Sequence, residues 1–432
     1  MNHQIQLVGV ALALLSQATM ADSPSSGQPG AGPPERVLHF PSYQAVGQVS
    51  LIDESYIAPE ISTEPGPGYA SMAARYWRPA QGDVRIPAGK GVYLRLGGLS
   101  VGQQQCIEVL KSLEPNDVQA LDFLQPLLLD DAILPYVARL KGLTSFCPLS
   151  ARFTAQGWLM LQSLPRLEHL CAPYGLTDAE MASIATLQTL EEVEILDARM
   201  TNTGLASIGQ LHNLQVLWLE STAMVTNEGL KTLAALPKLR SLRLAGQFTN
   251  QGLAYLAAAP SLKTLWLDTP RATEQGLGSL AQIQSLERLY VPWLDQVTNQ
   301  SIAYFKSMSK LRALGVGDAW SGDGGMVLLA SLTNLEVLAV KGGPNLTDNG
   351  LRPLAGMPKL RVLEIHDSQV TEQGLVYLSA CKKLESIHIR SSAPISQQAI
   401  AHLRTELAGV QTLDISQPQA PIGMSPLPVR QP

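Results

Sequence analysis

The chain has 432 residues, of which 45% are hydrophobic, 16% are charged and only 5% are aromatic, with a formal net charge of -5. A chain of this length can bury a large core, which must be built from aliphatic side chains because aromatic ones are scarce. The weak acidity excludes the basic footprint that nucleic acids or anionic membranes require. After residue 21 no apolar run approaches the roughly 18 residues of a membrane span.

The first residues predict a secretory signal over residues 1–21. Leu7–Leu15 is an apolar run of the length of a signal core, and small residues place cleavage after Ala18 or after Ala21. The segment departs from the usual pattern in having no Lys or Arg before the apolar run. Residues 22–36 are rich in Pro, Gly and Ser, which predicts a disordered linker. We therefore expect a secreted or periplasmic protein.

Residues 37–91 predict a small β-rich capping segment. Gln48–Ile52 and Asp83–Ile86 have the pattern of short strands, and Gly and Pro separate such pieces at Pro65–Gly68 and Pro87–Lys90. The end of a repeat array needs a polar cover, since an open strand edge invites aggregation. We expect this segment to provide that cover.

Residues 92–416 carry a repeated leucine frame, which reads L-x-x-L-x-L, then a loop, then T-[N/D/E]-x-G-L-x-x-L. Val92–Gly97 gives a first strand and Gln103–Leu113 a first helix. A period of 23 to 26 residues predicts an α/β solenoid of about 13 repeats, each packed on its neighbours. The frame starts at Val118, Leu143, Leu167, Leu190, Leu214, Leu239, Leu262, Leu286, Leu311, Leu335, Leu360, Leu384 and Val410.

The chemistry of one repeat explains the frame. The last two leucines of L-x-x-L-x-L are two residues apart, so both point to the core from one face of a short strand. The Thr can cap a helix, the Gly allows close packing under the turn, and the following L-x-x-L has helical spacing. We expect a horseshoe with a parallel inner sheet and short outer helices. The Pro-rich residues 417–432 lack the frame and predict a disordered tail.

With these motifs, residues 118–416 resemble the exported bacterial leucine-rich repeat proteins that have T-[D/N]-x-G-L units, akin to the cysteine-containing repeat subclass. Phe40–Leu96, with Ala88-Gly89-Lys90 before a strand, also resembles the leader of such proteins. The resemblance implies a protein-binding inner sheet. Most repeats lack the Asn that often follows the strand, so no Asn ladder is expected there. The chain has no F-box-like segment, so a role in ubiquitination does not carry over.

The residue between the two core leucines of each strand is predicted to face solvent on the concave sheet. Along the stack, this position brings Trp218, Arg243, Trp266 and Tyr290 into one row, with about 4.8 Å between strands. Such residues dominate binding interfaces, but an Arg stacked between two Trp rings would equally stiffen the sheet. Both interpretations stay open. Residues expected to extend or flank the row are Trp293, Trp320, Glu192, Glu194, Glu220 and Asp268.

Cys147 and Cys171 occupy the same position in consecutive repeats, at a separation that a disulfide can span. Export favours oxidation, whereas two parallel side chains on one sheet face disfavour the bond, so a disulfide and two free thiols both remain open. Cys106 and Cys381 lie on helical stretches and are expected to be buried small hydrophobic residues. No Cys or Cys/His spacing predicts structural zinc.

Glu364, His366 and His388 lie on neighbouring strands and could hold a metal, but a solvated charged pair accounts for them better. His169 beside Cys171 suggests a base and a nucleophile, yet no oxyanion device accompanies them. We therefore expect no catalytic residues, no metal and no cofactor.

Together these patterns predict a non-enzymatic, monomeric scaffold that binds a partner protein on its concave face, without nucleic acid and without spanning a membrane. The alternative is a structural component or spacer of an envelope or extracellular assembly. A hydrolase is the weakest interpretation, because repeats occupy nearly every stretch long enough for a catalytic domain.

Overall fold

The computed structural model describes residues 35–53, 77–124, 127–220, 223–269, 271–292, 298–318, 322–341 and 343–416. The chain divides into two compact units, Met1–Glu287 (unit 1) and Arg288–Pro432 (unit 2), each considered by itself below. The predicted signal at 1–21, residues 22–34 of the predicted linker and the tail at 417–432 lie outside the described residues. The linker prediction is wrong at Arg36, which lies in a strand.

Unit 1 begins with a small antiparallel β-structure, which we call the cap. Strand β1 pairs with β4, and β2 pairs with both β3 and β5. The two strands predicted at Gln48–Ile52 and Asp83–Ile86 correspond to β2 and β4. Strand β5 also pairs in parallel with the next strand, so the cap and the repeats share it. The bounds are β1 Arg36–His39, β2 Gly47–Asp53, β3 Arg78–Pro79, β4 Asp83–Ile86 and β5 Lys90–Gly97.

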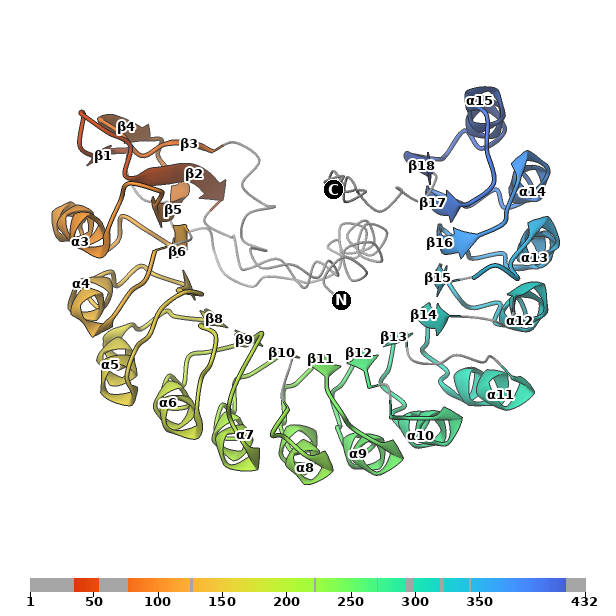
Figure 1. Cartoon of the computed structure of the whole chain (residues 1–432), viewed down its shortest axis with the longest axis horizontal. Coiled ribbons are helices and arrows are strands. Elements are labelled where there is room, and N and C mark those ends of the chain that lie inside the picture. Colours follow the sequence, from red (N-terminus) through yellow and green to blue (C-terminus); the bar gives the residue numbers. More distant parts are fainter. Residues whose placement is uncertain are drawn as a thin grey trace, which may run out of the picture. The chain divides into compact units, whose positions relative to one another are not determined.

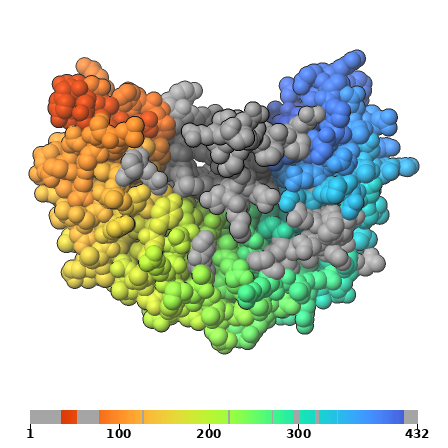
Figure 2. Space-filling view, in the orientation of Figure 1, coloured from red at the N-terminus to blue at the C-terminus, as the bar shows by residue number. Residues whose placement is uncertain are grey.

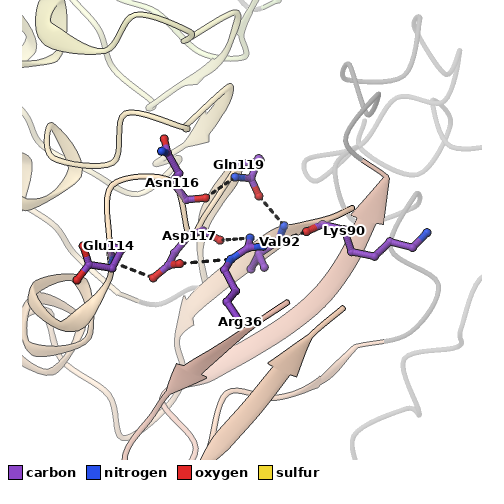
Figure 3. Close-up of polar contacts among 7 residues, drawn as sticks. All are labelled: Arg36, Lys90, Val92, Glu114, Asn116, Asp117 and Gln119. Atoms are coloured by element: carbon purple, nitrogen blue, oxygen red, sulfur yellow. Dashed lines mark hydrogen bonds and ion pairs between the residues drawn. The ribbon is translucent and has the colours of Figure 1, made fainter. Parts of the chain in front are cut away.

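Arg36 ties the cap to the first repeat. Its guanidinium donates to the backbone carbonyls of Lys90 and Asp117 at 3.3 and 3.0 Å, and it pairs with the Asp117 carboxylate at 3.3 Å (Figure 3). On the same loop, Gln119 accepts from the Val92 backbone N–H through its side chain at 2.8 Å. These contacts join segments up to 81 residues apart in sequence. They hold the edge of the cap against the start of the repeat array.

The rest of unit 1 alternates strands and helices. Its strands form a parallel ladder in the order β12-β11-β10-β9-β8-β7-β6-β5, with helices on the other side of each repeat (Figure 1). The strands are β6 Ala120–Leu124, β7 Ser145–Cys147, β8 His169–Ala172, β9 Glu192–Ile195, β10 Val216–Leu219, β11 Ser241–Ala245 and β12 Thr264–Asp268. The helices are α3 Gln103–Ser112, α4 Leu134–Val137, α5 Ala155–Leu159, α6 Asp178–Ile184, α7 Asn202–Ile208, α8 Leu230–Ala234, α9 Asn250–Leu256 and α10 Glu274–Leu280, with 3-10 turns at Asp131–Ile133, Met160–Ser163 and Asn227–Gly229.

Unit 2 has the same alternation, with a parallel ladder running from β13 to β18. Its strands are β13 Arg288–Val291, β14 Ala313–Asp318, β15 Val337–Lys341, β16 Val362–Ser368, β17 Ser386–Ser391 and β18 Thr412–Ser416. Its helices are α11 Asn299–Ser307, α12 Gly322–Leu329, α13 Asp348–Leu351, α14 Glu372–Leu378 and α15 Gln397–Glu406, with a 3-10 turn at Arg352–Gly356. The fold is an α/β leucine-rich repeat solenoid, as the repeat frame predicts.

The core lies between the strand layer and the helix layer. In β11 the frame leucines Leu242 and Leu244 are buried, and so are Leu253 and Leu256 of α9. Figure 2 shows the repeats of unit 1 as adjoining bands of colour, from orange to green. Each repeat therefore buries its apolar face on the next one, which is how a solenoid gains stability.

A polar lock joins successive repeats at the helix N-termini. The residue after the capping Thr reaches the Thr of the following repeat: the Asp348 carboxylate accepts from the backbone N–H and the hydroxyl of Thr371, both at 2.7 Å. Where Asn takes this position, Asn227 accepts from the Thr249 N–H at 3.1 Å and donates to its hydroxyl at 2.9 Å. A hydroxyl can donate or accept, which explains why Asp and Asn interchange in the frame. The same pairing recurs at Asp178–Thr201, Asn202–Thr226 and Asn250–Thr273. It also recurs at Asp131–Thr154 and Asp323–Thr347, where the Asp follows Asp130 and Gly322 in place of a Thr.

This lock explains the Gly of the frame. A Cβ added to Gly252 would lie 2.6 Å from Oδ1 of Asn227, and one added to Gly276 would lie 2.7 Å from Oδ1 of Asn250. Such distances are shorter than van der Waals contact allows, so a larger residue would push the Asp or Asn out of its position. The predicted capping role of Thr is also confirmed at several helices, as where Thr154 accepts from the Gly157 N–H at 3.1 Å.

Candidate functional site

The strand face of unit 1 carries a continuous row of polar and aromatic residues. The register pairs Trp218 on β10 with Arg243 on β11, and Arg243 with Trp266 on β12, as predicted. On the other side, Trp218 pairs with Glu194, and Glu194 pairs with Cys171. The leucine frame therefore places these side chains side by side on one surface.

Arg243 lies between two indole rings. Its guanidinium carbon is 5.4 Å from the ring centre of Trp218 and 4.8 Å from that of Trp266, within the range of cation–π attraction. Arg243 also pairs with the Glu220 carboxylate at 2.5 Å. We call Trp218, Arg243, Trp266 and Glu220 the Trp–Arg–Trp stack. Its parts come from three consecutive strands and the loop after β10.

The exposure of the stack is uneven, and this corrects the expectation that the whole row faces solvent. Trp218 and Arg243 are only 3% and 6% exposed. Neighbouring long side chains on adjacent strands cover one another's flanks, because the strands lie only about 4.8 Å apart. Trp266 is half-buried, the Glu220 side chain is 21% exposed and Asp268 is exposed. The accessible part of the site is thus the edge formed by Trp266, Glu220 and Asp268.

Carboxylates flank the stack on the same face. Partial desolvation raises the pKa of the Asp268 carboxyl, while the nearby Arg243 guanidinium opposes that rise. Glu194 is 3% exposed and lies beside a histidine rather than in solvent. The negative charge that remains accessible is therefore concentrated at Glu220 and Asp268, next to the Trp266 ring.

Cys147 and Cys171 lie on neighbouring strands β7 and β8, with their Cα atoms 4.5 Å apart and their sulfurs placed as a disulfide. This separation falls in the range that a disulfide spans. Cys147 and Cys171 are the two cysteines that the leucine frame places at the same position of consecutive repeats. The disulfide stays a prediction.

A buried polar cluster surrounds His169, two residues before the Cys171 position. Ser145, His169 and Glu192 are paired in register across β7, β8 and β9. His169 is 4% exposed; its Nδ1 lies 2.7 Å from the Ser145 hydroxyl and its Nε2 lies 3.7 Å from Oε1 of Glu194. Sequence reasoning missed Ser145 and the contact of the histidine with both glutamates. The position two residues before the row on each strand aligns Ser145, His169 and Glu192 across consecutive repeats.

In unit 2, Tyr290 is buried on β13 and paired in register with Gly315 on β14. Its ring fills the space that a Cβ on Gly315 would need, and burial raises the pKa of its hydroxyl well above the ordinary value. The structure thus gives Tyr290 a packing position rather than the solvent-facing one predicted. Trp293 and Trp320 lie outside the described residues.

Glu364 and His388 are paired in register on β16 and β17, as the frame predicts. His366 lies 3.8 Å from the Glu364 carboxylate, and His388 lies 3.6 Å from that of Asp414. Glu364, His366 and His388 are all buried, which corrects the expectation of a solvated charged pair. Their burial follows from the packing of the strand face, where adjacent polar side chains pair with one another.

Cys106 and Cys381 are buried free cysteines, as predicted. Burial raises the pKa of the Cys106 thiol to about 12 and that of Cys381 to about 11. Thiols with such values stay protonated at neutral pH, so they act as small apolar side chains rather than as nucleophiles. Among the helices that the structure describes, none combines the length and apolar character needed to cross a bilayer.

No protein-family model matches this sequence, and no curated protein matches it. Solved structures similar to the chain include an internalin from Listeria monocytogenes, which is 16% identical with a TM-score of 0.43; the match covers 66% of this chain and 83% of that one. Internalin C2 from the same organism is 21% identical with a TM-score of 0.33, and that match covers 50% of this chain and 84% of the other. The assignment of the repeat fold rests on the strands, the helices and the register between neighbouring strands.

Proposed function

We propose that this protein is a non-enzymatic, exported scaffold that binds a partner protein on the strand face of unit 1. The observation that supports the proposal is the accessible edge of the Trp–Arg–Trp stack. There a half-buried Trp266 lies on the strand that ends at the exposed Asp268, and Glu220 is partly exposed. A large aromatic ring beside charged groups is the composition typical of binding hot spots.

The geometry suggests what kind of partner would fit. Trp266 offers a ring face, already flanked by Arg243 on one side, and this fixed ring loses little side-chain freedom on binding. Glu220 is paired with Arg243, whereas Asp268 is a neighbouring carboxylate with much of its surface accessible. We infer a partner segment that brings an apolar or aromatic group to Trp266 and a Lys or Arg to Asp268.

The alternative is a structural spacer, and one observation favours it. Trp218 and Arg243 are almost fully buried, so this part of the stack contributes to packing and leaves little surface for a partner. Stacking of this kind stabilises a sheet by about 0.5–2 kcal/mol for each cation–π contact. In a spacer, Trp266 would contribute to stability and to nothing else.

Site-specific photo-crosslinking separates the two functions. A photoreactive residue in place of Thr264, on the same strand face as Trp266, should crosslink a single protein species in intact cells that export the chain. The matched control places the same residue at Ala254, which is exposed on helix α9 of the same unit. Equal crosslinking from both positions, or none from position 264, would contradict the proposed binding face.

A further inference from the structure

The His169 cluster is a second site on unit 1; it adjoins the Trp–Arg–Trp stack, because its Glu194 pairs in register with Trp218. It is built on β8 and β9, because register places His169 beside Glu192 and the frame brings Glu194 to the same face. One nitrogen of His169 and one carboxylate oxygen each of Glu192 and Glu194 lie within 4.8 Å of one another. Three ligand-bearing side chains that converge in this way can hold a metal ion.

Two of the three side chains are withdrawn from solvent, because His169 is 4% exposed and Glu194 is 3% exposed. Two carboxylates and one imidazole thus converge where two of the three groups are buried, and burying negative charge that is not fully compensated is costly. A divalent cation would neutralise both carboxylates at once.

We propose that His169, Glu192 and Glu194 bind a divalent transition-metal ion of the zinc class. The donor set of one imidazole nitrogen and two carboxylate oxygens suits such ions, whereas calcium and magnesium prefer oxygen alone. The 3.7 Å between Nε2 of His169 and Oε1 of Glu194 is close to the separation of about 3.4 Å between two ligands of a tetrahedral zinc. Glu192 is only half-buried, which leaves an approach from solvent.

Ser145 has a positioning role in this site. When Nδ1 of His169 carries the proton, it donates to the Ser145 hydroxyl at 2.7 Å and leaves the lone pair of Nε2 directed at Glu194. A hydrogen bond from the second ring nitrogen is the usual way in which proteins orient a metal-binding histidine. Cys171 lies 3.7 Å from Nε2. In the unreduced protein the predicted disulfide with Cys147 would remove its sulfur as a thiolate ligand.

The test is titration of the purified, unreduced full chain with zinc ions alone, followed by isothermal calorimetry. We expect saturable binding of about one ion per chain, weakened at least about tenfold by His169→Ala and about tenfold by Ser145→Ala. The matched control is His212→Ala, which removes an exposed histidine from the same unit and should leave binding unchanged. Circular dichroism checks that each variant folds. If His169→Ala does not fold, the zinc affinity of Glu192→Gln, a change at a half-buried position, tests the site in its place.

Cobalt substitution gives an independent readout of the ligand set. Cobalt bound to nitrogen and oxygen in the unreduced protein should show visible d–d bands without the thiolate charge-transfer absorption. A thiolate band would overturn the assignment of ligands. Absence of saturable zinc binding, or an affinity unchanged by His169→Ala, would overturn the site itself.

Discussion

Replacing Gly374 by Ala should destabilise the protein, although Ala is the better helix former. A Cβ at this position would overlap Oδ1 of Asp348, which accepts two hydrogen bonds from Thr371. At a half-buried site each bond to a carboxylate contributes about 1.5 kcal/mol, and the helix gains about 1 kcal/mol from the exchange of Gly for Ala. The net loss in the free energy of unfolding is about 2 kcal/mol.

The matched control is Gly324→Ala. Gly324 lies in helix α12 of the same unit, and an added Cβ would meet nothing within 4 Å. This variant should be stabilised by about 0.5–1 kcal/mol, because only the helix preference changes. Urea unfolding followed by circular dichroism measures both midpoints. If Gly374→Ala unfolds at the wild-type urea concentration or above it, the lock between repeats does not explain the Gly of the frame.

Three further predictions follow from contacts in unit 1. Arg36→Ala should destabilise the cap by about 2 kcal/mol, which would be measured as faster hydrogen exchange in β1 and β4. The control Arg85→Ala changes an exposed residue of β4 and should leave the exchange rates unchanged. Equal exchange rates in the two variants would contradict the role of Arg36 in joining the cap to the first repeat. Partial burial raises the pKa of Asp178, but hydrogen bonds from Thr201 and Gly204 outweigh it and hold the pKa below the ordinary value of about 3.9. The stability that Asp178 contributes is therefore present above that value and is lost as the pH falls through the folded-state pKa. The urea midpoint of wild type should exceed that of Asp178→Asn at neutral pH, and this difference should shrink on acidification. A difference that does not change with pH would contradict the prediction. Mass spectrometry of unreduced protein should find Cys147 and Cys171 joined, and free thiols at both positions would rule the disulfide out.

Much of the fold could be predicted from the sequence because the frame is local. The Leu, Thr and Gly of one repeat lie within a single turn of the solenoid, so their spacing alone indicates a strand, a cap and a helix. The register of the Trp218, Arg243 and Trp266 row follows from the same spacing, since equal repeats align equal positions.

The remaining features depend on contacts between repeats. The lock pairs Asp348 with Thr371, 23 residues further on, and a frame interpreted one repeat at a time does not show that their side chains meet. Arg36 contacts Asp117 across 81 residues, which no local pattern predicts. The burial of Trp218 and Tyr290 was likewise missed, because spacing assigns a residue to a face and says nothing about how fully its neighbours cover it.

The affinity of the crosslinked partner for the purified protein tests the proposed function most directly. Truncation of a hot-spot aromatic residue costs about 2 kcal/mol of binding free energy, so Trp266→Ala should weaken the partner's binding at least about tenfold in calorimetry. The same variant must retain its far-ultraviolet circular dichroism spectrum, which separates lost binding from lost folding. An unchanged dissociation constant for a folded Trp266→Ala protein would contradict binding at the strand face of unit 1.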